Sequence, residues 1–313
     1  MKNNSIRIAL IGLVALLTAA PVWAAEPPAF TRQQDIIYGR KDGMALTLDV
    51  LTPTEGAHGA AVIWVISGGW YSWHDAINPA GVAPLLKRGY TVFAVVHGSQ
   101  PRYTIPETIA DLNRAVRYVR FRAKDFQVDP ERFGITGGSA GGHLSLMVGT
   151  AGDAGDPLAK DPVDRVSSRV QAVACFFPPT DFLNYGEADS VDLGTKILVN
   201  FRAPFEFREL DRKQGFAGRL IPVTDEGRVL QIAREISPVY HVSRDDPPTL
   251  ILHGDADKLV PIQQAELIMA RFKEAGVPAE LSVKEGAGHG WNLQEDWGKI
   301  VDWFDRHLKP AGR

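Results

Sequence analysis

Residues 132–143 read RFGITGGSAGGH, and this stretch decides the fold. Its first five residues are typical of a short buried strand, and a helical segment follows the glycines. The pattern G-x-S-x-G between a strand and a helix predicts a sharp turn that lifts the hydroxyl of Ser139 above a sheet. Side chains at positions 137 and 141 would collide in such a turn, so both are glycine. The stretch predicts Ser139 as a nucleophile, with a structural or phosphate-binding glycine turn as the alternative.

Apolar runs flank this stretch on both sides. The predicted strands are 60–66, 90–96, 132–136, 170–176, 249–253 and 281–285, preceded by a hairpin of 35–40 and 45–51. Near-continuous runs of this kind are typical of a parallel sheet covered on both faces. Helical spacing of apolar residues predicts helices over 106–126, 263–274 and 291–308. Alternating strands and helices indicate a doubly wound α/β sheet.

A serine hydroxyl needs a base that accepts its proton, and two later loops supply candidates. The loop at 286–291 reads GAGHGW and contains His289, which we predict to act as general base and acid. The segment at 253–261 reads HGDADKLVP, and we predict that Asp257 orients the histidine and supports its positive charge. Asp255 is the competing carboxylate, with capping of its own loop as its other role.

An ester or amide carbonyl under attack also needs amide donors for the developing oxyanion. The loop after the first parallel strand reads SGGWYSWH from position 67. We predict that the amides of Gly68, Gly69 and Ala140 form the oxyanion hole. We also predict that Trp70 and Tyr71 line the substrate pocket, although core packing beneath the loop accounts for Trp70 equally well.

The segment 181–237 interrupts the alternation of strands and helices. It connects two predicted strands and is far longer than an ordinary connection of about 2–6 residues. It mixes aromatic and charged residues. Its position predicts a helical cap over the carboxyl ends of the strands, where α/β proteins bind ligands. Surface decoration is the alternative.

The amino terminus has the features of an export signal. Lys2 and Arg7 precede the apolar run 8–20, which is shorter than the ~20 residues of a membrane span, and small residues follow at 24 and 25. We predict a signal peptide over 1–24, a hydrolase domain over 25–313, and a periplasmic or secreted protein without a membrane span in its mature form. An uncleaved anchor helix is the alternative.

Composition narrows the class of partners. The 313 residues are 45% hydrophobic and carry a formal net charge of −3, with no basic run, so nucleic-acid binding is not expected. The only cysteine, Cys175, lies in an apolar run, and we interpret it as a core thiol. No clustered metal-ligand spacing occurs, and we predict neither metal nor cofactor.

Together these motifs resemble the esterase/lipase branch of the α/β-hydrolase superfamily, including hormone-sensitive-lipase-like and bacterial acetyl-esterase-like enzymes, and the catalytic domain of prolyl oligopeptidases. The resemblance covers about residues 60–308 and implies Asp257 as the catalytic acid. The family's His-Gly-Gly-Gly-Trp motif corresponds to Ile66–Trp70, where isoleucine and serine replace the histidine and one glycine. The run HGSQPRY at 97–103 also departs from the Tyr-Arg-Leu-Ala-Pro run common in lipase-like relatives.

The expected activity is hydrolysis of small or medium carboxylic esters through an acyl-serine, including acetyl or feruloyl groups on plant carbohydrate. A serine peptidase is one alternative, but the mature chain has too few residues before the first strand for the propeller domain of prolyl oligopeptidases. A binding protein that has kept the fold without catalysis is another.

Overall fold

A twisted eight-stranded sheet forms the centre of the molecule in the computed structural model, which describes residues 29–211 and 218–309. The predicted signal peptide, 1–24, lies outside the described residues. The strand order is β1-β2-β4-β3-β5-β6-β9-β10, in which β1, β2 and β4 pair antiparallel and the other neighbours pair parallel. The strands are β1 (Phe30–Lys41), β2 (Met44–Pro53), β3 (Ala61–Ile66), β4 (Thr91–Val96), β5 (Phe133–Thr136), β6 (Ala172–Phe176), β9 (Thr249–Gly254) and β10 (Ala279–Lys284).

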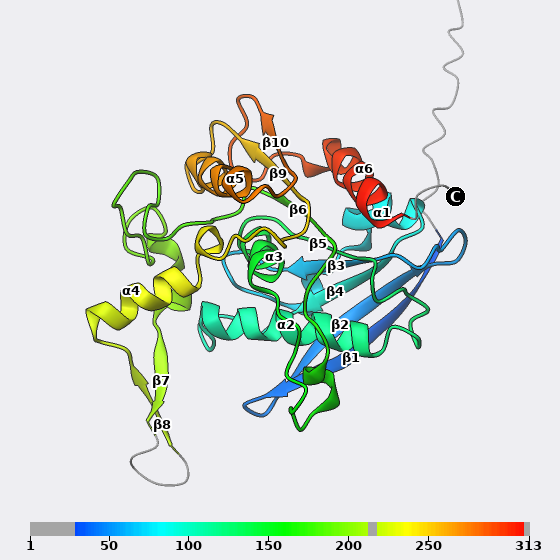
Figure 1. The fold of residues 1–313 in the computed structure, drawn as a ribbon, viewed down its shortest axis with the longest axis horizontal. Coiled ribbons are helices and arrows are strands. Elements are labelled where there is room, and N and C mark those ends of the chain that lie inside the picture. The colour runs from blue at the N-terminus through cyan, green and yellow to red at the C-terminus, as the bar shows by residue number, and fades with distance from the viewer. Residues whose placement is uncertain (1–28, 212–217, 310–313) are drawn as a thin grey trace, which may run out of the picture.

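Helices cover both faces of this sheet (Figure 1). They are α1 (Ala83–Lys87), α2 (Ile105–Phe121), α3 (Ala140–Ala151), α5 (Gln263–Ala275) and α6 (Trp297–Leu308). Apolar residues of α2, α3 and α5 pack in one hydrophobic cluster, and those of α1 and α6 pack in another. Strand residues alternate between the two clusters, as Val62 and Ile63 do on β3, so the central strands are apolar throughout. This confirms the predicted doubly wound α/β fold.

Two predicted helices have different ends in the structure. The helix predicted over 106–126 ends at Phe121, and turns continue to 127. The helix predicted over 291–308 begins at Trp297, because the preceding chain is held in a turn: the carboxylate of Asp296 accepts hydrogen bonds from the indole of Trp291 and from Lys299.

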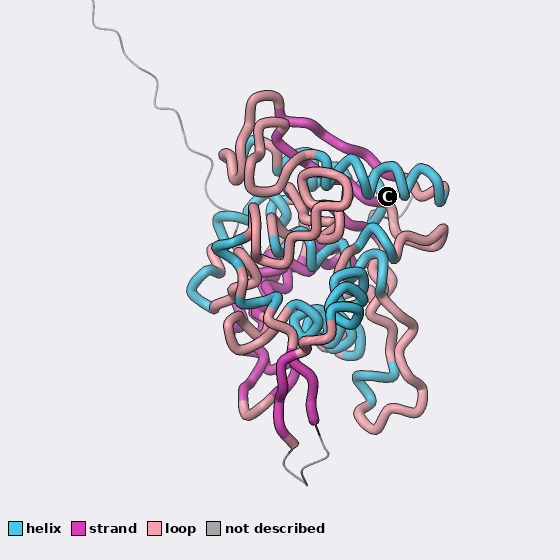
Figure 2. Tube along the Cα trace, turned by 90° about the vertical axis from the view of Figure 1, so that its left-hand side faces the viewer, coloured by secondary structure: helices cyan, strands magenta, loops and turns pink. Residues whose placement is uncertain are grey.

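The insertion at 181–237 is only partly helical. It contains short 3-10 turns, a hairpin of β7 (Arg208–Asp211) and β8 (Arg219–Pro222), and the helix α4 (Glu226–Glu235). The expectation of a helical cap is therefore wrong for most of its length. Figures 1 and 2 both show the hairpin projecting away from the body of the molecule. Within the described part of the chain, none of the helices combines the length and the apolarity needed to cross a membrane.

Candidate active site

The turn between β5 and α3 holds Ser139 in a strained conformation, with φ of 54° and ψ of −121°. Its amide donates to the carbonyl oxygen of Phe176 on the neighbouring strand, at 3.0 Å. The turn tolerates no side chain at 137, since a Cβ there would lie 2.6 Å from the backbone of Gly141. These contacts fix the serine at the carboxyl edge of the sheet, directly before the amino terminus of α3.

Three predicted side chains meet at this edge. The Nε2 atom of His289 lies 3.0 Å from Oγ of Ser139, and its Nδ1 atom lies 2.7 Å from Oδ2 of Asp257. A carboxylate only accepts, so Nδ1 carries the proton and Nε2 is the free base that faces the serine. His289 follows β10 and Asp257 follows β9, so the carboxyl ends of three parallel strands supply the group.

The carboxylate of Asp257 is buried yet fully satisfied. Its Oδ1 atom accepts from the amides of Leu259 and Val260, both at 2.9 Å. Burial raises the pKa of Asp257, but hydrogen bonds from His289 and these amides outweigh it and bring the pKa below its usual value. Asp255, the competing carboxylate, instead accepts from the amide of Gly286 at 2.6 Å and so caps the neighbouring loop.

The structure of the loop Ser67–Ser72, called here the oxyanion loop, contradicts one of the predicted amide donors. The amide of Gly68 donates to the carbonyl oxygen of Tyr71 at 2.9 Å, and the reverse bond closes a tight turn. Gly68 therefore has no free amide for an oxyanion, and its predicted role is wrong in this conformation. The amides of Gly69 and Ala140 make no hydrogen bond within the described residues.

The two predicted pocket residues lie in different environments. Trp70 is only 2% exposed and packs edge-on against Phe205, and its indole donates to Nδ1 of His143 at 3.1 Å. Trp70 is thus part of the core beneath the loop, which is the alternative that the sequence left open, and it does not line the pocket. Tyr71 is exposed and stacks obliquely on Trp73.

Two phenylalanines that sequence reasoning did not single out contact the site. The ring of Phe177 packs against the ring of His289 at 4.5 Å, centre to centre. Phe201, from the insertion, lies over Gly69 so closely that a Cβ at that glycine would be 2.4 Å from the ring. Phe177 follows a strand as one of many apolar residues, and Phe201 is distant in sequence, so neither carried a recognisable signal.

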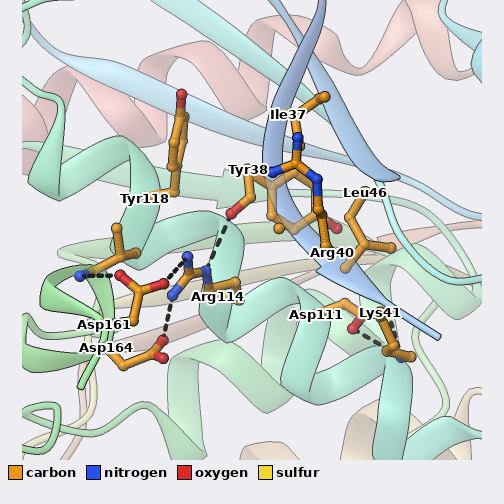
Figure 3. Close-up of a pocket in the computed structure, with 12 residues that line it drawn as sticks. Ile37, Tyr38, Arg40, Lys41, Leu46, Asp111, Arg114, Tyr118, Asp161 and Asp164 are labelled. Atoms are coloured by element: carbon orange, nitrogen blue, oxygen red, sulfur yellow. Dashed lines mark hydrogen bonds and ion pairs between the residues drawn. The ribbon is translucent and has the colours of Figure 1, made fainter. Parts of the chain in front are cut away.

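Most charged side chains around one cavity away from the triad form internal pairs. A cavity of about 480 Å³ between β1 and α2 is lined by Lys41, which pairs with Asp111, and by Arg114, which pairs with Asp161 and Asp164 (Figure 3).

One group in the described chain brings potential metal ligands within 4.8 Å of one another: Asp35, Asp49 and His74. The Asp49 carboxylate there already has Arg32 at 2.6 Å. This arrangement is that of a buried ion pair in which the protein's own cation neutralises the carboxylate.

Comparison with known proteins places this chain in a family. The BD-FAE family model matches residues 48–272. The probable carboxylic ester hydrolase LipM of Mycobacterium tuberculosis is 31% identical over 78% of this chain and 52% of its own length. Esterase LipC of the same organism is 28% identical over 91% of this chain and 69% of its own length. The chain thus spans about half of LipM and about two thirds of LipC.

Solved structures agree on the fold. A truncated carbohydrate esterase from gut microbiota is 27% identical, with a TM-score of 0.70, over 90% of this chain and 98% of its own. An acetyl ester-xyloside bifunctional hydrolase from Caldicellulosiruptor lactoaceticus has a TM-score of 0.66 at 24% identity, over 87% of this chain and 93% of its own. With the family match over most of the sheet, these findings show that the chain belongs to the BD-FAE family of α/β-hydrolase esterases.

Proposed function

We propose that this protein is a serine-dependent carboxylic ester hydrolase that acts through an acyl-serine. The observation that carries the proposal is the continuous hydrogen-bonded chain from Ser139 through His289 to Asp257. Family membership and the similarity to esterases support it.

The geometry supports a two-step reaction. In the first step, Oγ of Ser139 attacks the ester carbonyl carbon while its proton passes to Nε2 of His289. The carbonyl oxygen gains the negative charge and is stabilised by the amides of Gly69 and Ala140. The intermediate then expels the alcohol, which takes its proton from the imidazolium.

In the second step, His289 removes a proton from water as the water attacks the acyl-serine. Collapse of this second intermediate returns the proton to Ser139 and releases the carboxylic acid. Asp257 stays ionised throughout and stabilises the imidazolium, which its depressed pKa allows.

The proposed substrates are esters of acetyl or other small and medium acyl groups, including esters on carbohydrate. The carbohydrate part rests on the 27% identical esterase described above and on its almost complete coverage. The second candidate function is that of a serine peptidase. This candidate predicts that Ser139 also cleaves peptide anilides.

The deciding experiment treats the purified protein with a fluorophosphonate probe and p-nitrophenyl acetate. We expect labelling and ester turnover in the wild type and neither in Ser139→Ala. An unlabelled wild type, or undiminished labelling of the variant, contradicts the proposal. A panel of acetylated sugars, longer acyl esters and peptide anilides then assigns the substrate class.

Export is a separate proposal that rests on the sequence of residues 1–25. Expression of the full chain in a bacterium, followed by intact mass measurement of the periplasmic fraction, tests it. We expect loss of the first 24 or 25 residues, and an uncleaved chain in the membrane fraction would contradict it.

A further inference from the structure

We propose that His97 and Ser67 form a hydrogen-bonded pair that positions the oxyanion loop, and that His97 is thereby a positioning residue for catalysis. The proposal rests on the proposed ester hydrolysis and adds a residue pair to it. It starts from a contact between two loops that follow the neighbouring parallel strands β3 and β4.

The pair has one possible arrangement of hydrogens. Nδ1 of His97 lies 2.8 Å from the carbonyl oxygen of Gly98, and Nε2 lies 2.9 Å from Oγ of Ser67. A carbonyl oxygen only accepts, so Nδ1 carries the proton and Nε2 is an acceptor in the neutral ring. The hydroxyl of Ser67 must therefore donate to Nε2. The ring is 3% exposed, and burial lowers the pKa of His97 to about 4, so it is neutral near pH 7.

Further bonds tie the segment His97–Gln100 to the oxyanion loop. The hydroxyl of Ser72 accepts from the amide of His97 at 3.2 Å and donates to the carbonyl oxygen of Ile66 at 2.6 Å. The amide of Ser72 donates to Oγ of Ser99 at 3.0 Å. The amide of Gln100 donates to the carbonyl oxygen of Trp70 at 3.2 Å. The loop is therefore held at both ends of its turn by the segment that follows β4.

The segment His97–Gln100 is itself anchored away from the site. The amide of Gly98 donates to Oδ2 of Asp111 on α2 at 2.9 Å, and Lys41 neutralises that carboxylate at 2.8 Å (Figure 3). The buried carboxylate has these partners on both sides, so its position is fixed. The oxyanion loop is thus connected through His97–Gln100 to a rigid helix.

Ser67 lies beside the serine turn. It is two residues before Gly69, and its Cβ lies 3.7 Å from the place a Cβ would take on Gly141 in the serine turn. Misplacement of a catalytic group by about 1 Å costs on the order of 100-fold in rate. Release of Ser67 would therefore reduce transition-state stabilisation without removing any group that binds the ground state.

The test compares disruptive with conservative substitutions. In Ser67→Ala and His97→Phe the bond is lost, and we expect kcat to fall about 10- to 100-fold with KM within about 2-fold. Ser67→Thr keeps a hydroxyl and His97→Gln keeps an acceptor, and both should recover most of kcat. The double variant Ser67→Ala/His97→Phe should be no slower than the slower single variant, because the two residues act as a unit.

His58→Phe is the matched control, since His58 lies just before β3, at the opposite end of that strand from Ser67. It should keep the wild-type kcat per folded molecule. Wild-type kcat in His97→Phe, equal losses in Ser67→Ala and Ser67→Thr, or additive losses in the double variant would each overturn the inference.

Hydrogen exchange gives a readout that does not depend on activity. The amides of Gly68, Tyr71 and Ser72 are bonded in the structure, and we expect faster exchange for them in both disruptive variants but not in His58→Phe. Unchanged exchange overturns the positional role. If the fluorophosphonate probe does not label the wild type, the proposed function is refuted instead. The hydrogen-exchange rates then still test whether His97 and Ser67 hold the loop in place.

Discussion

The Nε2 atom of His289 lies 3.0 Å from Oγ of Ser139, although 150 positions separate the two residues in the chain. The contact exists because both residues follow parallel strands of the same sheet. The carboxyl ends of parallel strands lie at one edge, so loops distant in sequence converge there. Asp257 binds the other nitrogen of the ring and Phe177 packs against the ring, so little reorientation is needed for proton transfer.

Substitution of each carboxylate by its amide should show that Asp257, and not Asp255, is the catalytic acid. Asp257→Asn should lower kcat by about 10⁴-fold, because an amide facing Nδ1 holds the imidazole in the wrong tautomer and cannot support its positive charge. Asp255→Asn is the matched control and should stay within about 3-fold, since Asp255 only caps the loop at Gly286. Steady-state kinetics with p-nitrophenyl acetate measures both, and equal losses would mean that the acid is misassigned.

The two glycines of the oxyanion loop should respond differently to alanine. Gly69 has φ of 55° and a Cβ there would meet Phe201 at 2.4 Å, so Gly69→Ala should lower both kcat and thermal stability. Gly68 has open space at its Cβ position and its amide is already bonded to Tyr71, so Gly68→Ala should keep kcat within about 3-fold. A large loss in Gly68→Ala with normal folding would restore Gly68 as a donor.

Acid should destabilise the folded protein through two buried histidines. Burial lowers the pKa of His97 and of His143 to about 4, whereas both titrate near 6.5 in the unfolded chain. Between these values the unfolded state binds more protons, so the free energy of unfolding falls with falling pH, by about 1.4 kcal/mol per pH unit for each histidine. A hydrogen bond also disfavours the protonated form of His143. Its Nδ1 atom accepts from the indole of Trp70 and cannot carry a proton as well.

Urea unfolding at pH 7.5, 6.0 and 5.0 measures this slope. His143→Gln should be less stable than the wild type at pH 7.5 and should lose less stability on acidification. If His143→Gln and the wild type lose stability equally with falling pH, titratable groups other than His143 cause the acid sensitivity.

Phe201 should influence selectivity for the substrate more than the chemical step itself. Its ring covers Gly69, so Phe201→Ala opens space beside the proposed oxyanion hole. We expect a shift of kcat/KM toward longer acyl or bulkier alcohol groups by about 5- to 10-fold, the effect of roughly 1 kcal/mol in a hydrophobic pocket. Leu220→Ser, on the projecting hairpin of the same insertion, is the control and should leave the ester profile unchanged.

The sequence predicted the strands and the order of Ser139, Asp257 and His289 because each depends on a local pattern. Glycines around Ser139 and an acidic loop after a strand are readable from neighbouring residues. The prediction for Gly68 was wrong and the two roles of Trp70 stayed open, because these roles depend on a turn closed by Tyr71 and on packing against Phe205, which no local pattern records. The run that begins at His97 stands out in the sequence, but its contact with Ser67 does not, since Ser67 follows another strand.

The backbone of Ser139, at φ of 54°, has a consequence for protein engineering. With ψ of −121° this backbone lies in a sparsely populated region that costs a non-glycine residue about 1–3 kcal/mol, and glycine adopts it without that cost. Ser139→Gly would therefore yield a more heat-resistant and inactive protein. A library selected for thermal tolerance alone would enrich such inactive sequences, so selection must require turnover in the same round.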